Sequence, residues 1–168
     1  MNQQPDAIII GAGVIGSAIA FEMSKRGYKT LNIDKLPAAG FGSTSNSCAI
    51  VRFHYSTWDG AAMAFENYFY WKDWENHIGP VDERGYSRYV ECGFVILSMD
   101  DAENEHFIKL FDRVGVTYEL WDLETLGQRV PIADLHNFYP PRTLDDEAFW
   151  DESTKMLVGG LYNPQAGY

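Results

Sequence analysis

Apolar residues near the start of the chain form two short runs with a helical pattern between them. The first run covers residues 7–10 and the second covers residues 30–33. Between them, from residue 14 to about residue 26, apolar side chains recur every four residues at Ile15, Ile19 and Met23, as on one face of an α-helix. The pattern therefore predicts a strand, a helix and a second strand, with the two strands parallel.

The rest of the chain alternates between amphipathic stretches and short apolar runs. We expect helices at 59–74, 101–114 and 123–130, and strands at 91–98, 116–120 and 157–162. On the first helix the buried side is expected to carry Ala62, Phe65, Phe69 and Tyr70. On the second it is expected to carry Ala102, Phe107, Leu110, Phe111 and Val114, with Asp100 or Asp101 as the N-cap.

These elements predict an α/β chain with a Rossmann-like βαβ start and the beginning of an antiparallel-sheet domain. We expect a nucleotide-binding domain at residues 1–85 and a second domain at residues 86–168. Parallel sheets are normally covered on both faces and need several strands, and only two parallel strands are predicted. The chain is therefore expected to be the N-terminal part of a longer protein, or one piece of a nicked protein.

Composition narrows the classes of function. The formal net charge is −11, which argues against nucleic acid or an anionic membrane surface as a partner. No apolar run reaches the roughly 18 residues of a membrane span, and residues 1–6 lack the pattern of a secretory signal. Cys48 and Cys92 form no CxxC pair, so neither a zinc site nor a disulfide framework is indicated. We expect a cytoplasmic protein with no bound metal.

The turn between the first strand and the helix carries a glycine pattern with specific chemistry. Gly11 permits a tight turn, Gly13 lets the backbone approach a diphosphate, and Gly16 lets the helix pack against the strand. Asp34, at the end of the second strand, is placed to accept hydrogen bonds from a ribose. The pattern predicts dinucleotide binding; the alternative is a glycine-rich turn that binds nothing, and the motif alone does not separate NAD from FAD.

Four segments resemble one known family. Residues 8–18 are similar to the FAD-binding start of the D-amino-acid oxidase-like flavoprotein superfamily, and residues 42–56 to the second flavin segment of its sarcosine oxidase and dimethylglycine dehydrogenase branch. Residues 92–97 resemble the first strand of that branch's substrate domain, and residues 159–168 the segment that precedes its return to the FAD domain. The resemblance spans the chain, implies FAD as cofactor and supports the expectation of a longer protein.

The resemblance also implies which residues contact the cofactor. The glycine turn would hold the FAD diphosphate, Asp34 and Lys35 would meet the adenosine ribose, and the second segment would wrap the ribityl chain and the flavin edge. The full implied set is Gly11, Gly13, Val14, Ile15, Gly16, Asp34, Lys35, Gly42, Ser43, Thr44, Ser45, Ser47, Cys48, Ala49 and Ile50. No histidine precedes His54 in this second segment, so covalent flavin attachment there is not expected.

For substrate binding, the resemblance points to Arg52 and Tyr55. A guanidinium suits a substrate carboxylate because its planar fork makes two parallel hydrogen bonds. The alternative is a structural Arg52 bonded to backbone carbonyls or to the flavin. Tyr55 is also open to a packed role, and His54 to a packed or a solvated one; either could instead adjust the flavin or the substrate. His77, His106 and His136 lack ligand spacing and are expected on the surface.

The predicted function is FAD-dependent oxidation of the C–N bond of an amine or amino acid, with no catalytic base identified. The expected partners are a small amine or amino-acid substrate and the rest of the same polypeptide or a complementary chain. Three alternatives stay open: a related flavoprotein that oxidises a hydroxy acid or polyol phosphate, a non-catalytic nucleotide-binding module that requires a partner chain, and an NAD enzyme. The second glycine-rich segment favours FAD, and residues 1–168 alone are expected to be inactive.

Overall fold

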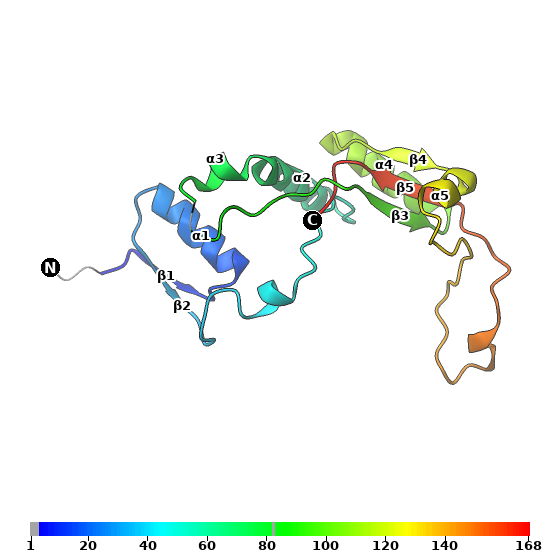
Figure 1. Ribbon diagram of the computed structural model, residues 1–168, viewed down its shortest axis with the longest axis horizontal. Coiled ribbons are helices and arrows are strands. Elements are labelled where there is room, and N and C mark those ends of the chain that lie inside the picture. Colours follow the sequence, from blue (N-terminus) through cyan, green and yellow to red (C-terminus); the bar gives the residue numbers. More distant parts are fainter. Residues whose placement is uncertain (1–3, 82) are drawn as a thin grey trace. The chain divides into compact units, whose positions relative to one another are not determined.

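The computed structural model describes residues 4–81 and 83–168 and divides into two compact units, Met1–Ala49 and Ile50–Tyr168 (Figure 1). The first unit contains a strand β1 (Ala7–Ile10), a helix α1 (Val14–Lys25) and a strand β2 (Thr30–Ile33). Each residue of β1 pairs with one of β2 in a parallel register that runs from Ala7 opposite Thr30 to Ile10 opposite Ile33. The predicted parallel βαβ start is confirmed.

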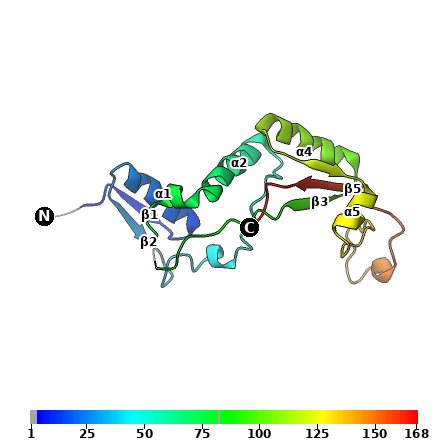
Figure 2. The same ribbon diagram turned by 45° about the horizontal axis from the view of Figure 1, so that its top comes forward.

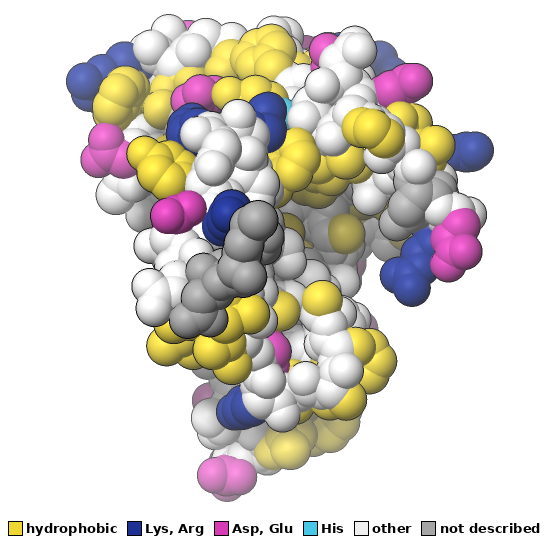
Figure 3. Space-filling view, turned by 90° about the vertical axis from the view of Figure 1, so that its left-hand side faces the viewer, with side chains coloured by type: hydrophobic (Ala, Val, Ile, Leu, Met, Phe, Trp, Pro, Cys, Tyr) yellow, Lys and Arg dark blue, Asp and Glu magenta, His cyan; other side chains and the backbone are white. Residues whose placement is uncertain are grey.

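Apolar side chains of the first unit are largely on its surface. Ile9 of β1 is buried, whereas its neighbours Ile8 and Ile10 are 60% and 90% exposed. Ile15 and Ile19, which form the predicted apolar row of α1, are exposed as well. Figure 3 shows apolar side chains on the surface among charged ones. Helix α1 contacts both strands. Among the described residues, however, this strand pair does not have both of its faces covered, as parallel sheets normally do.

The second unit begins with two consecutive helices, α2 (Trp58–Lys72) and α3 (Trp74–Ile78). Thr57 caps α2 because its side chain accepts a hydrogen bond from the Gly60 N–H. A single helix over 59–74 was predicted, but α2 ends at Lys72 and Asp73 has a non-helical backbone conformation. The predicted buried side was also partly wrong: Phe69 and Tyr70 are exposed. The buried positions of α2 are instead Ala61 and Tyr68.

A three-stranded antiparallel sheet forms the centre of the second unit (Figure 2). Its order is β3 (Phe94–Ser98), β5 (Gly159–Asn163) and β4 (Glu119–Trp121), so the last strand in the sequence lies in the middle. The antiparallel layer predicted for this part of the chain is confirmed. All three strands begin two or three residues later than the apolar runs indicated.

Helix α4 (Asp101–Val114) lies along this sheet and contacts β3 (Figure 2). Asp100 is its N-cap, since its side chain accepts a hydrogen bond from the Glu103 N–H. Phe111 is buried as predicted, but Ala102 is exposed. Asn104 is buried in its place and accepts a 2.7 Å hydrogen bond from the Ser98 hydroxyl. A polar pair therefore joins the end of β3 to the first turn of α4.

The remaining elements are a helix α5 (Leu123–Arg129) and two short 3-10 turns, η1 (Ser43–Asn46) in the first unit and η2 (Glu147–Trp150) in the second. Asp122 caps α5 through a bond from the Thr125 N–H. Between α5 and β5, residues 131–156 extend from the sheet as a long loop that contains η2 and the predicted proline-rich segment (Figure 1). No helix among residues 4–81 and 83–168 is long and apolar enough to cross a membrane.

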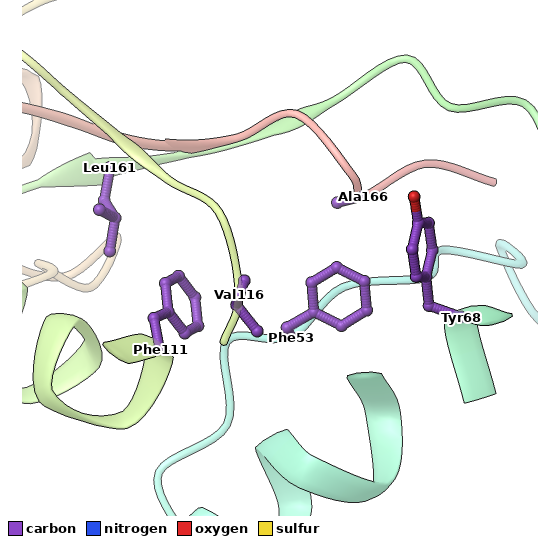
Figure 4. Close-up of a cluster of buried hydrophobic side chains, with 6 residues drawn as sticks. All are labelled: Phe53, Tyr68, Phe111, Val116, Leu161 and Ala166. Atoms are coloured by element: carbon purple, nitrogen blue, oxygen red, sulfur yellow. The ribbon is translucent and has the colours of Figure 1, made fainter. Parts of the chain in front are cut away.

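The core of the second unit joins segments that are far apart in the sequence (Figure 4). The ring of Phe53 is fully buried and lies 5.7 Å from that of Tyr68, in an edge-to-face arrangement. The other buried members are Phe111, Val116, Leu161 and Ala166. Close backbone contact completes the arrangement, because a Cβ on Gly167 would lie 2.0 Å from the Val90 carbonyl oxygen. The 50–54 segment is thereby fixed between α2, α4 and the C-terminal residues.

Candidate functional site

The turn between β1 and α1 has the geometry of a close backbone approach. Gly11 has a φ of +103°, in the region that favours glycine, and its N–H donates to the Ile33 carbonyl at 2.7 Å. A Cβ on Gly16 would lie 2.0 Å from the Gly11 carbonyl oxygen, so only glycine fits at the start of α1. A Cβ on Gly11 would meet nothing within 4 Å, which leaves the backbone of the turn accessible from that side.

Asp34 lies beside this turn and is bonded to it. One carboxylate oxygen accepts the Ala12 N–H at 2.7 Å, and the other accepts the Leu36 N–H at 2.8 Å. These two hydrogen bonds, that from Ala12 first, lower the pKa of Asp34 below its usual value. The carboxylate is therefore ionised and fixed at the carboxyl ends of both strands. Ala12 was not among the predicted site residues, although its position within the glycine pattern was the signal for it.

The loop after β2 is hydrogen-bonded to the turn that precedes α1. The Gly40 N–H donates to the Ala12 carbonyl at 2.9 Å, and the Val14 N–H donates to the Thr44 hydroxyl at 3.0 Å. A Cβ on Gly13 would lie 3.0 Å from that same hydroxyl oxygen. The structure therefore brings the Gly11–Gly16 turn, Asp34 and Thr44 together in one place.

The other residues expected to bind cofactor in this unit are less constrained. Within the η1 turn, the Ser45 hydroxyl donates to the Gly42 carbonyl at 3.0 Å, and the Ala49 N–H donates to the Ser47 hydroxyl at 3.0 Å. Ala49 has a φ of +55°, which is uncommon for a residue with a side chain. The remaining four, Lys35, Gly42, Ser43 and Cys48, are exposed. Ile50 belongs to the second unit.

Arg52 and Tyr55 both lie in the second unit and contact each other. The Arg52 guanidinium is 5.0 Å from the centre of the Tyr55 ring, and its Nη1 donates to the His54 backbone carbonyl. Within the part of the chain that the structure describes, no carboxylate lies within ion-pair distance of Arg52. The side chain is half-buried, so its charge is held in place with its remaining donors available.

His54 is buried and not solvated. It is 3% exposed, and neither ring nitrogen has a hydrogen-bond partner among the described residues. Burial, and then the charge of Arg52, lower its pKa from 6.5 to about 4, so the ring is neutral near pH 7. Of the other histidines, His106 and His136 are exposed as expected, whereas His77 is half-buried against Tyr70 and Trp74.

Neither cysteine belongs to a group of possible metal ligands among the described residues. Cys48 and Cys92 are both exposed and free. No group of three or more His, Cys, Asp or Glu side chains in residues 4–81 and 83–168 is placed to hold a metal ion.

Comparison with known proteins identifies the family. The sequence profile described as "DAO: FAD dependent oxidoreductase" matches residues 6–168. This chain belongs to that family. The match confirms the predicted resemblance to D-amino-acid oxidase-like flavoproteins, and it confirms FAD as the predicted cofactor. A search of curated proteins gave no match.

Solved structures show the same fold in part of larger proteins. L-Proline dehydrogenase from P. horikoshii is 22% identical with a TM-score of 0.73, over 99% of this chain and 38% of that chain. Glycine oxidase from Geobacillus kaustophilus is 18% identical with a TM-score of 0.64, over 97% of this chain and 40% of that chain. L-Amino acid deaminase from Proteus vulgaris is 15% identical with a TM-score of 0.68, over 99% and 35%. This chain thus spans less than half the length of these DAO-family structures.

The residues of the first unit fit the diphosphate and ribose of FAD. The backbone is open at Gly11, and the first turn of α1 begins with N–H groups that have no acceptor within the helix. These groups and the helix dipole attract phosphate despite the net charge of −11. Asp34 retains lone pairs for ribose hydroxyls after accepting from Ala12 and Leu36.

Proposed function

We propose that this chain is part of an enzyme that uses FAD to oxidise the C–N bond of an amine or amino acid. The observation that carries the proposal is the half-buried Arg52, which is held by its neighbours and has no carboxylate partner among the described residues. In a flavoprotein of this family, such a group suits the carboxylate of an amino-acid substrate. The names of the solved relatives, a proline dehydrogenase, a glycine oxidase and an amino acid deaminase, are consistent with this substrate class.

Residues of both units have roles in this proposal. In the first unit, Gly11, Gly13, Val14, Ile15 and Gly16 hold the diphosphate, and Asp34 with Lys35 holds the ribose. The second segment contacts the ribityl chain and flavin edge through Gly42, Ser43, Thr44, Ser45, Ser47, Cys48, Ala49 and Ile50. When bound, FAD supplies a two-electron oxidation, taking the equivalent of a hydride from the carbon next to the amine nitrogen. The imine product hydrolyses in water.

Arg52 orients the substrate by pairing with its carboxylate, and Tyr55 supports Arg52 through its ring face. The proposed oxidation requires no general base from the chain if the amine binds in its neutral form, and we assign none. The proposal extends to the sarcosine and dimethylglycine class on the strength of the resemblance of residues 42–56. It also keeps residues 1–85 and 86–168 as the parts of two domains, and a cytoplasmic location, which the two free cysteines favour.

Anaerobic reduction of the flavin tests the proposal. The natural gene product, purified with its flavin, is mixed without oxygen with N-methylglycine, N,N-dimethylglycine, L-proline, glycine and D-alanine in turn. At least one of these is expected to bleach the yellow flavin absorbance. Arg52→Met is then expected to raise KM for that substrate by about a hundredfold, because a bidentate charge-assisted contact is lost.

The same experiment, extended to a hydroxy acid and a polyol phosphate, separates the alternatives. Bleaching only by a hydroxy acid or a polyol phosphate would identify the related class of flavoprotein. A protein that binds FAD but is bleached by none of these compounds would be a non-catalytic module. Purified protein that contains no flavin and takes none up when FAD is added would contradict the proposal as a whole.

A further inference from the structure

The most unusual group in the second unit is the imidazole of His54. It is 3% exposed, and both of its ring nitrogens lack a hydrogen-bond partner among the described residues. A buried polar group without a partner costs about 1–3 kcal/mol, so its retention calls for a physical reason. Its neighbours on the chain supply one, because Arg52 precedes it by two residues and Tyr55 follows it.

Three phenylalanine rings surround His54. Its ring centre lies 4.8 Å from that of Phe111, 5.3 Å from that of Phe94 and 5.6 Å from that of Phe107. Phe94 belongs to β3, and the other two belong to α4. The imidazole is therefore anchored between the sheet and the helix that lies along it, and Phe53, the residue before it, is fully buried in the adjoining core.

This anchoring determines where the backbone of residue 54 points. The carbonyl of His54 accepts a hydrogen bond from Nη1 of Arg52, so its direction sets the direction of the guanidinium. The Tyr55 ring lies 5.0 Å from the guanidinium carbon. Because the guanidinium is planar, one fixed nitrogen and one contacting ring leave it few orientations.

We propose that His54 is a positioning residue for Arg52: its imidazole, anchored by Phe94, Phe107 and Phe111, fixes the carbonyl that orients the guanidinium toward a substrate carboxylate. The inference rests on the proposed function, because it gives Arg52 a carboxylate to bind. It adds that recognition of the carboxylate depends on a side chain that does not touch it. The neutral state of the buried ring supports this role, since a second positive charge two residues from Arg52 would repel the guanidinium.

The test compares L-proline with pyrrolidine, which has the same ring and no carboxylate, on the natural gene product with its flavin. N-Methylglycine and dimethylamine form a second such pair. His54→Ala is expected to raise KM for the carboxylated member by about tenfold, with kcat and the KM of the amine without carboxylate within about twofold of the original. His54→Phe keeps an aromatic anchor and is expected to restore KM to within about threefold.

A matched control excludes general loss of packing. Leu126 on α5 is fully buried beside Gly160 of β5, and Leu126→Ala removes a buried side chain outside the His54 pocket. It is expected to lower the thermal midpoint as His54→Ala does, without changing the ratio of KM between L-proline and pyrrolidine. An equal rise in that ratio in Leu126→Ala would overturn the positioning role.

The outcomes distinguish this inference from the proposed function. If Arg52→Met raises the KM ratio and His54→Ala does not, the positioning role is wrong and the role of Arg52 stands. If neither variant changes the ratio, Arg52 does not bind the carboxylate and the positioning role is wrong, while the oxidation of the amine stands. Should no amine be oxidised, a crystal structure of the His54→Ala protein still decides, because an Arg52 bond to the residue 54 carbonyl that is unchanged would overturn the inference.

Discussion

Gly16 lies where the first turn of α1 passes closest to the backbone that leaves β1. A Cβ there would lie 2.0 Å from the Gly11 carbonyl oxygen, and neither group belongs to a flexible side chain. Gly16→Ala is therefore expected to displace the turn and to reduce the FAD bound per protein by more than about tenfold, because the diphosphate contacts depend on its geometry. The measurement is the ratio of flavin to protein in the purified natural gene product. Ser17→Ala, one residue further on an exposed position, should retain its flavin, and a fully loaded Gly16→Ala protein would contradict the expectation.

His54 also gives stability a defined dependence on pH. Its pKa is about 4 in the folded protein and 6.5 in the unfolded chain, so between these values the unfolded state binds more protons. The contribution of His54 to stability is therefore fully present above about pH 6.5 and is lost as the pH decreases toward 4. On going from pH 7.5 to pH 5, protonation of this one group in the unfolded chain is expected to lower the free energy of unfolding by about 2 kcal/mol.

The comparison that isolates this effect uses His54→Phe. The difference in thermal midpoint between pH 7.5 and pH 5 is measured for both proteins, and other titrating groups contribute equally to each. The variant is expected to lose less stability on acidification than the original protein. If the two proteins lose the same amount, His54 is not the group responsible, and its ring is protonated in the folded state.

The two adjacent acids at the start of α4 differ in whether they cap the helix. Asp100 accepts the Glu103 N–H at 2.8 Å, whereas Asp101 is the first residue of the helix and its side chain caps no N–H among the described residues. Asp100→Ala is expected to cost about 1 kcal/mol of stability, since an N–H at the helix start loses its acceptor. Asp101→Ala removes the same charge nearby and is expected to change stability by less than about 0.5 kcal/mol. Equal thermal midpoints for the two variants would rule out the cap.

Elements set by local pattern could be predicted from the sequence, and those set by tertiary packing could not. The βαβ start follows from the apolar period and from Gly27, which has a φ of +84° directly after the helix. The break at Asp73 was not predicted, because the aromatic pattern continues through it into Trp74, whose ring stacks on Trp71 at 4.4 Å. Exposure of Ala102 and burial of Asn104 depend on the Ser98 hydroxyl at the end of β3, a contact that periodicity does not reveal.

The residues of the candidate site that local geometry brings together could also be predicted from the sequence, and those joined by tertiary contacts could not. Gly11, Gly16 and Asp34 could be placed from their spacing, because a strand–turn–helix brings them together by local geometry. The bond between Thr44 and the Val14 N–H joins positions 30 residues apart, and only the resemblance pointed to Thr44. The pocket around His54 combines residues of β3 and α4, which are 40 or more positions away in the sequence, so the sequence left packed, solvated and flavin- or substrate-adjusting roles open for it.

A chain of net charge −11 is expected to bind a diphosphate through local groups. The N–H groups at the start of α1 attract the anion, but only over the first turn of the helix. The net negative charge of the chain repels the anion at longer range. FAD affinity in the apoprotein is therefore expected to rise as NaCl is increased from 20 mM to about 300 mM, because salt screens the distant carboxylates more than the contacting N–H groups. Titration of FAD into apoprotein, followed by flavin fluorescence, measures this. A steep fall in affinity with salt would show that a basic surface contributes instead.

The first unit is expected to be poorly protected from hydrogen exchange when no flavin is bound. Ile8, Ile10, Ile15, Leu31 and Ile33 are all exposed, and Ile9 is the one large apolar side chain of β1, α1 and β2 that is buried among the described residues. A two-stranded parallel pair with so little buried area does not offset the entropy of ordering its residues. Amide hydrogens of residues 7–10 are therefore expected to exchange within seconds in the flavin-free 168-residue chain, while those of β5 are protected. Hydrogen exchange with mass spectrometry measures both segments, and slow exchange at residues 7–10 in the flavin-free chain would contradict the expectation.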